Sequence, residues 1–126
     1  MLKLLTIGLG GFLGAVLRFG LSVFIHRHAT GSFPFGTLAV NTAGCLVMGA
    51  VLCLVEERQL FSPETRLFLI VGLLGSFTTF SAVGFDTFAL LRAGEPRMAV
   101  VNAAANMGLG IAAVAVGWIG VKATGA

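Results

Sequence analysis

The chain alternates long apolar stretches with short polar segments, and this pattern predicts four membrane-spanning helices. The apolar stretches cover residues 4–25, 36–55, 67–91 and 98–121, and each of the three segments between them contains a proline. A helix needs about 20 apolar residues to cross the hydrocarbon core of a bilayer. The sequence therefore predicts an all-α integral membrane protein, with a single four-helix domain over residues 1–126.

Composition strengthens this prediction. Hydrophobic residues make up 57% of the chain and charged residues only 10%, whereas about 25% of a soluble domain is charged. The net charge of +3 comes from scattered basic residues, which argues against nucleic-acid binding. The N-terminus resembles a secretory signal, but its apolar run continues past Arg18 and three more stretches follow, so we interpret it as the first span.

The loop charges predict the orientation of the chain in the membrane only weakly. Four spans place both termini on one side. Four basic residues lie on that side and three on the other, namely Lys3, Arg58, Arg66 and Lys122 against Arg27, Arg92 and Arg97. The Lys/Arg excess that sets orientation is 4 − 3 = 1, or 4 − 4 = 0 if Arg18 reaches the second surface. Insertion in both orientations with pairing of inverted copies is one interpretation, and a fixed orientation is the other.

Polar residues inside the spans are the candidates for function, because each needs a partner in lipid. Asn102 and Asn106 are four residues apart and share a helix face, as do Thr37 and Asn41. Such amides often join helices. Their N–H groups are also donors, and a row of them can replace the water around a small anion.

The third span is unusual at Gly72–Ser81, where two glycines precede adjacent threonines. This is a poor centre for a helix. A break here, near the middle of the membrane, would free backbone carbonyls, which suit a cation of modest charge, and a packing kink is the alternative. Phe80 belongs to a group of phenylalanines that either face lipid or offer an anion the positive edge of the ring.

Two charged residues also lie within spans. Arg18 either reaches an interface or pairs with a carbonyl or an acid. Asp86 follows the expected break by about 15 Å of helix, which predicts a position near a vestibule. The two cysteines and two histidines cannot assemble a four-ligand zinc site. Because no nucleophile–base pair or phosphate loop is visible either, we expect no enzyme.

Three segments together resemble the Fluc (CrcB) family of fluoride channels, and the resemblance covers essentially the whole chain. The segments are Gly14–Arg18, Gly36–Asn41 and Gly72–Ser81. The resemblance implies an antiparallel, dual-topology homodimer in a bacterial plasma membrane, with two pores along its interface. It also implies a structural sodium ion at the dimer centre, bound by the main-chain carbonyls of Gly75 and Thr78.

The resemblance further implies a fluoride pathway that includes Asn41, Asn102, Asn106 and Phe80, with Thr37 and Ser81 beside them. Members of the family usually carry a second phenylalanine three residues after Phe80, where this chain has Val83. They also usually carry Glu at the position of Asp86, and many have Ser at that of Gly110. Half of the aromatic pair is therefore missing here.

The predicted function is passive export of fluoride that enters the cell as HF from acidic surroundings. A small proton-coupled drug exporter is an alternative, but it needs a carboxylate in the first span, where this chain has only Arg18. A non-transporting subunit of a membrane assembly is the other alternative.

Overall fold

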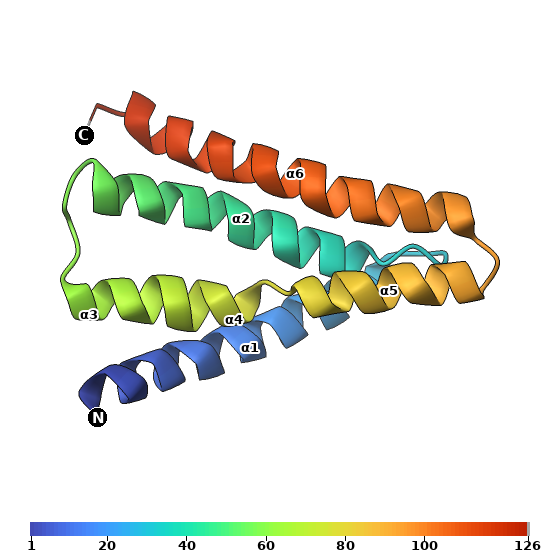
Figure 1. The fold of residues 1–126 in the computed structure, drawn as a ribbon, viewed down its shortest axis with the longest axis horizontal. Helices are drawn as coiled ribbons and strands as arrows, with labels where there is room; N and C mark the ends of the chain where they lie inside the picture. Colours follow the sequence, from blue (N-terminus) through green and yellow to red (C-terminus); the bar gives the residue numbers. More distant parts are fainter. Residues whose placement is uncertain (126) are drawn as a thin grey trace.

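The computed structural model describes residues 1–125, which form a bundle of long helices with both termini at one end (Figure 1). The first two hydrophobic stretches form α1 (Leu2–His28) and α2 (Phe35–Glu56), and the last forms α6 (Pro96–Ala123). All four stretches in the described part of the chain, of 22 to 30 residues each, are long and apolar enough to cross a membrane. The prediction of an all-α protein with four spans is confirmed.

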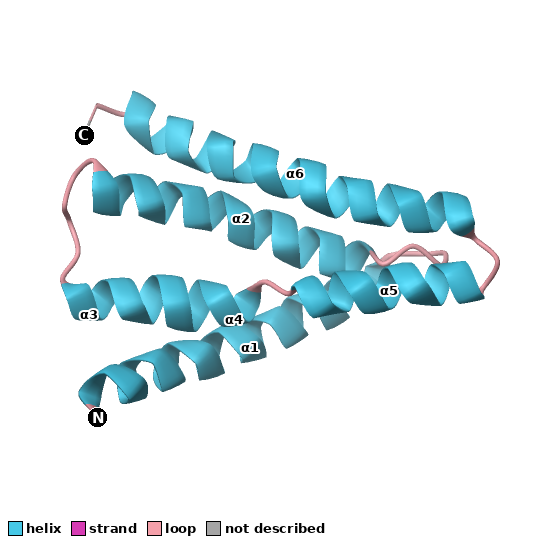
Figure 2. Cartoon of the chain, viewed as in Figure 1, coloured by secondary structure: helices cyan, strands magenta, loops and turns pink. Residues whose placement is uncertain are grey.

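The third stretch is divided into four segments. It begins with α3 (Pro63–Arg66), continues as a π-helix, η1 (Leu67–Leu74), and then as α4 (Gly75–Phe77), and ends with α5 (Phe80–Arg92). Figure 2 shows the loop that separates α4 from α5, about halfway along the stretch. The sequence pattern did not predict the π-helix, a winding that is rare beyond a single turn, and nothing in its residues explains it.

Large apolar side chains cover much of the surface of the bundle. Phe12 and Phe19 on α1 are exposed, as are Val100 and Ile111 on α6. A soluble protein seldom exposes contiguous apolar patches of this extent. The surface therefore suits a lipid environment.

Two pairs of helices approach closely at glycines. A Cβ on Gly14 of α1 would overlap with the Leu73 carbonyl of η1, and a Cβ on Gly117 of α6 would overlap with the Leu46 carbonyl of α2. Small residues at such contacts let two backbones touch, which is how helices associate in membranes. The α2–α6 and α1–η1 contacts are the most extensive in the bundle, and the second of them packs the first half of the third stretch against α1.

The contact at Gly117 gives a first prediction. We expect Gly117→Ala to lower the free energy of unfolding by about 1–3 kcal/mol, because the added methyl group forces α2 and α6 apart. Gly120 lies on the same helix with nothing near its Cβ position, so Gly120→Ala is the matched control and should be neutral. Denaturant titration of the purified protein in detergent compares the two variants, and equal stabilities would contradict this account of the packing.

Candidate functional site

The side chains singled out by the sequence gather where the third stretch is interrupted. Helix α4 ends at Phe77, and Thr78 and Thr79 are extended (φ/ψ −81°/156° and −151°/119°) before α5 begins. β-branched threonines favour an extended backbone. Thr79 also caps α5, because its hydroxyl accepts a hydrogen bond from the Ala82 amide at 3.2 Å. The interruption thus lies at the threonines, while Gly72 and Gly75 remain helical.

Two side chains from other helices bind the carbonyls freed by this interruption. Arg18 of α1 donates from Nε to the Ser76 carbonyl at 3.1 Å. Asn41 of α2 donates from Nδ2 to the Thr79 carbonyl at 3.0 Å. Arg18 is half-buried and binds a carbonyl here rather than reaching the end of the bundle. It therefore does not add to the loop charges, and the basic excess on the side of the termini is 4 − 3 = 1.

Three further carbonyls at the interruption remain without a donor. Within residues 1–125, no N–H or O–H group donates to the main-chain oxygens of Gly75, Phe77 or Thr78. In an unbroken helix these oxygens would accept hydrogen bonds from the following turn. They are free to bind a ligand, such as a cation.

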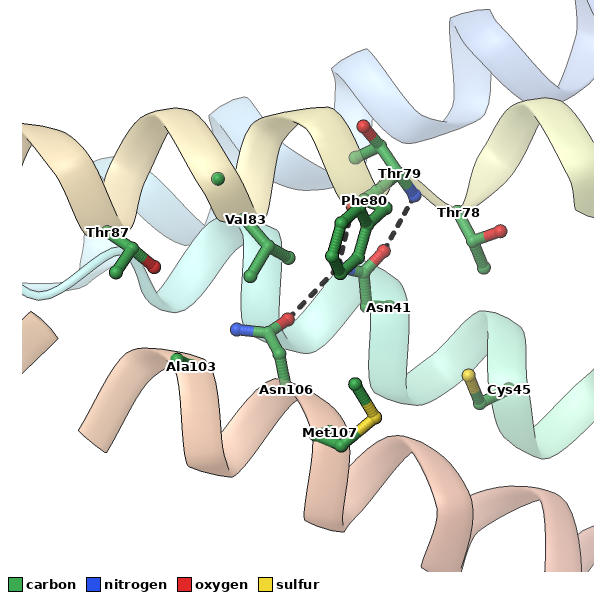
Figure 3. Close-up of a pocket in the computed structure, with 11 residues that line it drawn as sticks. Asn41, Cys45, Thr78, Thr79, Phe80, Val83, Thr87, Ala103, Asn106 and Met107 are labelled. Carbon is green, nitrogen blue, oxygen red and sulfur yellow. Dashed lines mark hydrogen bonds between the residues drawn. The ribbon is translucent and has the colours of Figure 1, made fainter. Parts of the chain in front are cut away.

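Asn41 holds the interruption in place by bonding both main-chain polar groups of Thr79. Its Oδ1 accepts from the Thr79 amide at 2.8 Å, while its Nδ2 donates to the Thr79 carbonyl and, at 3.0 Å, to Oδ1 of Asn106 (Figure 3). The amide can face only one way, because one neighbour is a donor and the others are acceptors. Asn41 is 8% exposed, so these bonds are shielded from competing water.

The hydrogen bonds continue from Asn106 along α6 to α5. Asn106 Nδ2 donates to the Asn102 carbonyl at 2.9 Å and to Asn102 Oδ1 at 3.1 Å. Asn102 Nδ2 donates in turn to the Thr87 hydroxyl of α5 at 2.9 Å. Asn102 is wholly buried. It therefore holds Asn106 in position without lining the cavity. The sequence had grouped the two as equivalent pore-lining residues.

A cavity of about 470 Å³ opens beside this network, between α2, α5 and α6. Figure 3 shows the residues around it, which include Asn41, Phe80, Val83, Thr87, Asn106 and Met107. Phe80 stands at the rim with 79% of its surface exposed, whereas Val83 is 7% exposed. None of the described residues that line the cavity carries a charge.

The first turn of α5 gives this region a positive electrostatic character. Within residues 1–125 the backbone N–H groups of Phe80 and Ser81 have no acceptor, as is usual in the first turn of a helix. The positive end of the helix dipole adds to their effect. Ser81 is exposed there, and its hydroxyl pairs with that of Thr79 at 3.1 Å. The arrangement offers donors, and no acidic side chain lines the cavity in the described structure, which suits a small anion.

A second, smaller cavity of about 170 Å³ lies on the other side of Thr79. Arg18 and Thr37 line it, and the Thr37 hydroxyl donates to Asp86 Oδ2 at 2.6 Å. Asp86 lies on α5, one turn after Ala82, and this hydrogen bond connects it to α2. Two charged side chains lie near the interruption, the Asp86 carboxylate and the Arg18 guanidinium. Each has a hydrogen-bond partner within the protein.

The structure brings most of the residues singled out by the sequence into one neighbourhood. Around the interruption or its two cavities lie Arg18, Thr37, Asn41, Thr78, Phe80, Val83 and Asn106. Gly75 is exposed on α4, and Asn102 is buried behind the cavity. Sequence reasoning overlooked Thr87, although it follows Phe80 and Val83 by seven and four residues and so lies on their face of the helix.

Acidic, histidine and cysteine side chains do not converge anywhere in residues 1–125 in the threes that would hold a metal ion. The fold and the site instead define a small, multi-pass membrane protein of the ion-channel class, with an uncharged cavity at a broken helix. Comparison with known proteins agrees with this class. The family model described as CrcB-like protein, Camphor Resistance (CrcB) matches residues 5–118, and the chain belongs to this family.

Several curated relatives match over nearly the whole chain. A protein of Parabacteroides distasonis named fluoride-specific ion channel FluC is 44% identical, over 94% of this chain and 92% of its own. Fluoride-specific ion channel FluC 1 of Methanosarcina acetivorans is 43% identical, over 94% and 90%. The protein of Nitratidesulfovibrio vulgaris named fluoride-specific ion channel FluC is 38% identical, over 95% and 94%.

Proposed function

We propose that this protein is a fluoride-specific ion channel that lets fluoride leave the cytoplasm passively. Its membership of the CrcB family and the names of its relatives support this function. The structural observation that carries it is the uncharged cavity beside the interruption, which Phe80 lines with a backbone N–H group that has no acceptor within residues 1–125. An anion that sheds its hydration shell needs such donors in place of water. Efflux of trapped fluoride from liposomes tests the proposal.

In this proposal the cavity is a section of the fluoride pathway. Asn41 and Asn106 line it, and an entering fluoride replaces Asn106 Oδ1 as the acceptor of the Asn41 amide. Phe80 presents the positive edge of its ring at the rim. Thr37 and Ser81 flank the path on either side of the interruption, and Asn102 keeps Asn106 in position rather than touching the ion.

Val83 is the position where the pathway departs from the aromatic pair of the family. It lines the cavity three residues after Phe80, and about 470 Å³ of space lies beside it. We expect Val83→Phe to raise the rate of fluoride efflux about two- to tenfold, because a second ring edge attracts the anion by about 0.5–1.5 kcal/mol. Val83→Leu is the control, since it adds bulk without a ring. A similar gain in both variants would argue against a role for the ring edge.

We further infer that two copies assemble as an inverted homodimer with a pore on each side. The loop charges support insertion in both orientations, because the basic excess is a single residue. The exposed positions of Phe80 and Gly75 support an interface that contains the interruption. The same proposal places this multi-pass protein in the plasma membrane of a bacterial cell, inserted in both orientations.

A sodium ion at the centre of this dimer fits the free carbonyls. Main-chain oxygens are ligands for hard cations, and those of Gly75 and Thr78 accept no hydrogen bond within residues 1–125. Two such oxygens from each of two inverted chains would supply four. When bound, sodium would stabilise the interface and would take no part in moving fluoride.

The sodium proposal predicts that dimer stability depends on the cation. In sodium buffer we expect the purified protein to have the mass of two chains, and in N-methylglucamine buffer we expect about a tenfold or larger rise in the dissociation constant, equivalent to about 1.4 kcal/mol. Light scattering across a dilution series measures both. The same dissociation constant in the two buffers would contradict the sodium site, whereas a single-chain mass in both would contradict the dimer.

The two alternative functions have less support. A proton-coupled drug exporter would need a carboxylate in α1, and α1 contains none. A non-transporting assembly subunit would release no fluoride from liposomes. The relatives are named as ion channels, which favours conduction over both alternatives.

A further inference from the structure

The amide side chains around the cavity form a hydrogen-bond chain in which each group donates to the next. The Thr79 amide donates to Asn41, Asn41 donates to Asn106, Asn106 donates to Asn102, and Asn102 donates to the Thr87 hydroxyl, over distances of 2.8, 3.0, 3.1 and 2.9 Å. Its direction is fixed at the start, because a backbone N–H can only donate. The chain therefore determines how the last group, Thr87, is oriented.

Thr87 ends this chain with its own hydrogen unused. Its oxygen accepts from Asn102, and no oxygen within residues 1–125 accepts its hydroxyl hydrogen, not even the carbonyl one turn before it. Thr87 lines the 470 Å³ cavity together with Val83 and Asn106 (Figure 3). The free O–H group is therefore available to a molecule or ion in the cavity.

Most of the other polar side chains of the cavity are hydrogen-bonded to protein atoms, including the Thr79 hydroxyl, which accepts from the Ala82 amide and pairs with the Ser81 hydroxyl. Both hydrogens of the Asn41 amide bind protein oxygens, as does the Asn106 amide. The Thr78 hydroxyl donates to the Leu74 carbonyl at 3.0 Å. Cys45 retains its S–H group, which is a weak donor. Among the side chains that line the cavity in the described structure, Thr87 thus offers the strongest free donor.

We infer that Thr87 is a specificity-determining residue whose hydroxyl donates a hydrogen bond to the fluoride ion in the cavity. This inference rests on the proposed fluoride conduction. A hydroxyl that already accepts one hydrogen bond is a stronger donor, because bonds in a chain polarise one another. A bond to an ionised acceptor is shorter and roughly twice as strong as a neutral one. Fluoride, the most strongly accepting halide, gains most from such a donor.

The test is fluoride efflux from liposomes that contain the full chain or one of three Thr87 variants. Thr87→Val keeps the shape and removes the hydroxyl, and we expect efflux to fall about tenfold or more, as for the loss of a hydrogen bond to a charged group. Thr87→Cys keeps a weak donor, so its rate of fluoride efflux should lie between those of Thr87→Val and wild type. Thr87→Ser keeps the hydroxyl and should stay within about threefold of wild type.

Thr42→Val is the matched control. Thr42 lies on α2 in a groove outside the cavity, and its buried hydroxyl has no partner in the described structure. Removing that hydroxyl should leave efflux unchanged. All variants are compared at equal protein content after size-exclusion chromatography, and Thr87→Cys with Thr87→Ser decides the outcome if Thr87→Val does not fold.

Several results would overturn the assignment of Thr87. Efflux at the wild-type rate in Thr87→Val would do so, as would equal losses in Thr87→Val and Thr87→Ser, since the loss would then follow shape. A comparable loss in Thr42→Val would do so as well. A wild-type protein that releases no fluoride would overturn the proposed function itself, whereas a conducting wild type with an equally active Thr87→Val overturns only this inference.

Discussion

Substituting Asn41 by Asp should reduce fluoride efflux at least about 100-fold, the largest effect we expect from any single change. Asn41 donates two hydrogen bonds and accepts one at the interruption. A carboxylate donates none, so the Thr79 carbonyl and Asn106 Oδ1 would face a like charge. Losing two such bonds costs roughly 2–6 kcal/mol where the groups are buried, and a negative charge beside the cavity also repels fluoride.

Efflux from liposomes measures this effect, with Thr42→Val as the control one position along α2. A folded Asn41→Asp protein, with the same size-exclusion profile as wild type and the same rate of fluoride release, would remove Asn41 from the pathway. It would also show that the hydrogen bonds between Asn41 and the main chain of Thr79 are unnecessary for conduction. Because Asn41 begins the chain of amides, the substitution tests the polarity of the whole network.

Substituting Phe80 by Ile should reduce fluoride efflux by roughly 30-fold. Phe80 occupies the rim of the cavity, at the first position of α5. An isoleucine keeps the apolar bulk but lacks the ring quadrupole, and charge–quadrupole interactions reach about 2 kcal/mol when the partners are desolvated.

Phe88→Ile is the matched control for this prediction. Phe88 is also exposed on α5 but does not line the cavity. Fluoride release from liposomes should be normal in Phe88→Ile and slow in Phe80→Ile. If both variants conduct like wild type, the ring edge at Phe80 plays no part in selecting fluoride, and the free N–H groups of α5 would have to provide the attraction alone.

The number and extent of the spans could be predicted from the sequence because they depend on composition and length alone. Three of the four apolar stretches became unbroken helices that extend one to three residues beyond their predicted ends, as α2 does at Phe35 and Glu56. The segment Gly72–Ser81 was also recognisable, since glycines and paired threonines weaken a helix. The structure then places the interruption at the threonines, where the cap formed by Thr79 outweighs the flexibility of the glycines.

The connections within the site could not be predicted from one sequence. A four-residue spacing puts Asn102 and Asn106 on one face of α6 but does not tell which of them reaches a cavity, because that depends on how α5 packs against α6. The binding of Arg18 to the Ser76 carbonyl depends likewise on the approach of α1 to η1. The π-helical winding of η1 leaves no recognised pattern in the sequence.

The central claim is that this chain alone conducts fluoride selectively. The most direct test is to reconstitute only this protein into liposomes loaded with potassium fluoride or potassium chloride, and to follow anion release after valinomycin is added to carry potassium. We predict rapid release of fluoride and release of chloride no faster than from protein-free liposomes. Fluoride release at the protein-free rate, or equally fast release of both anions, would contradict the claim.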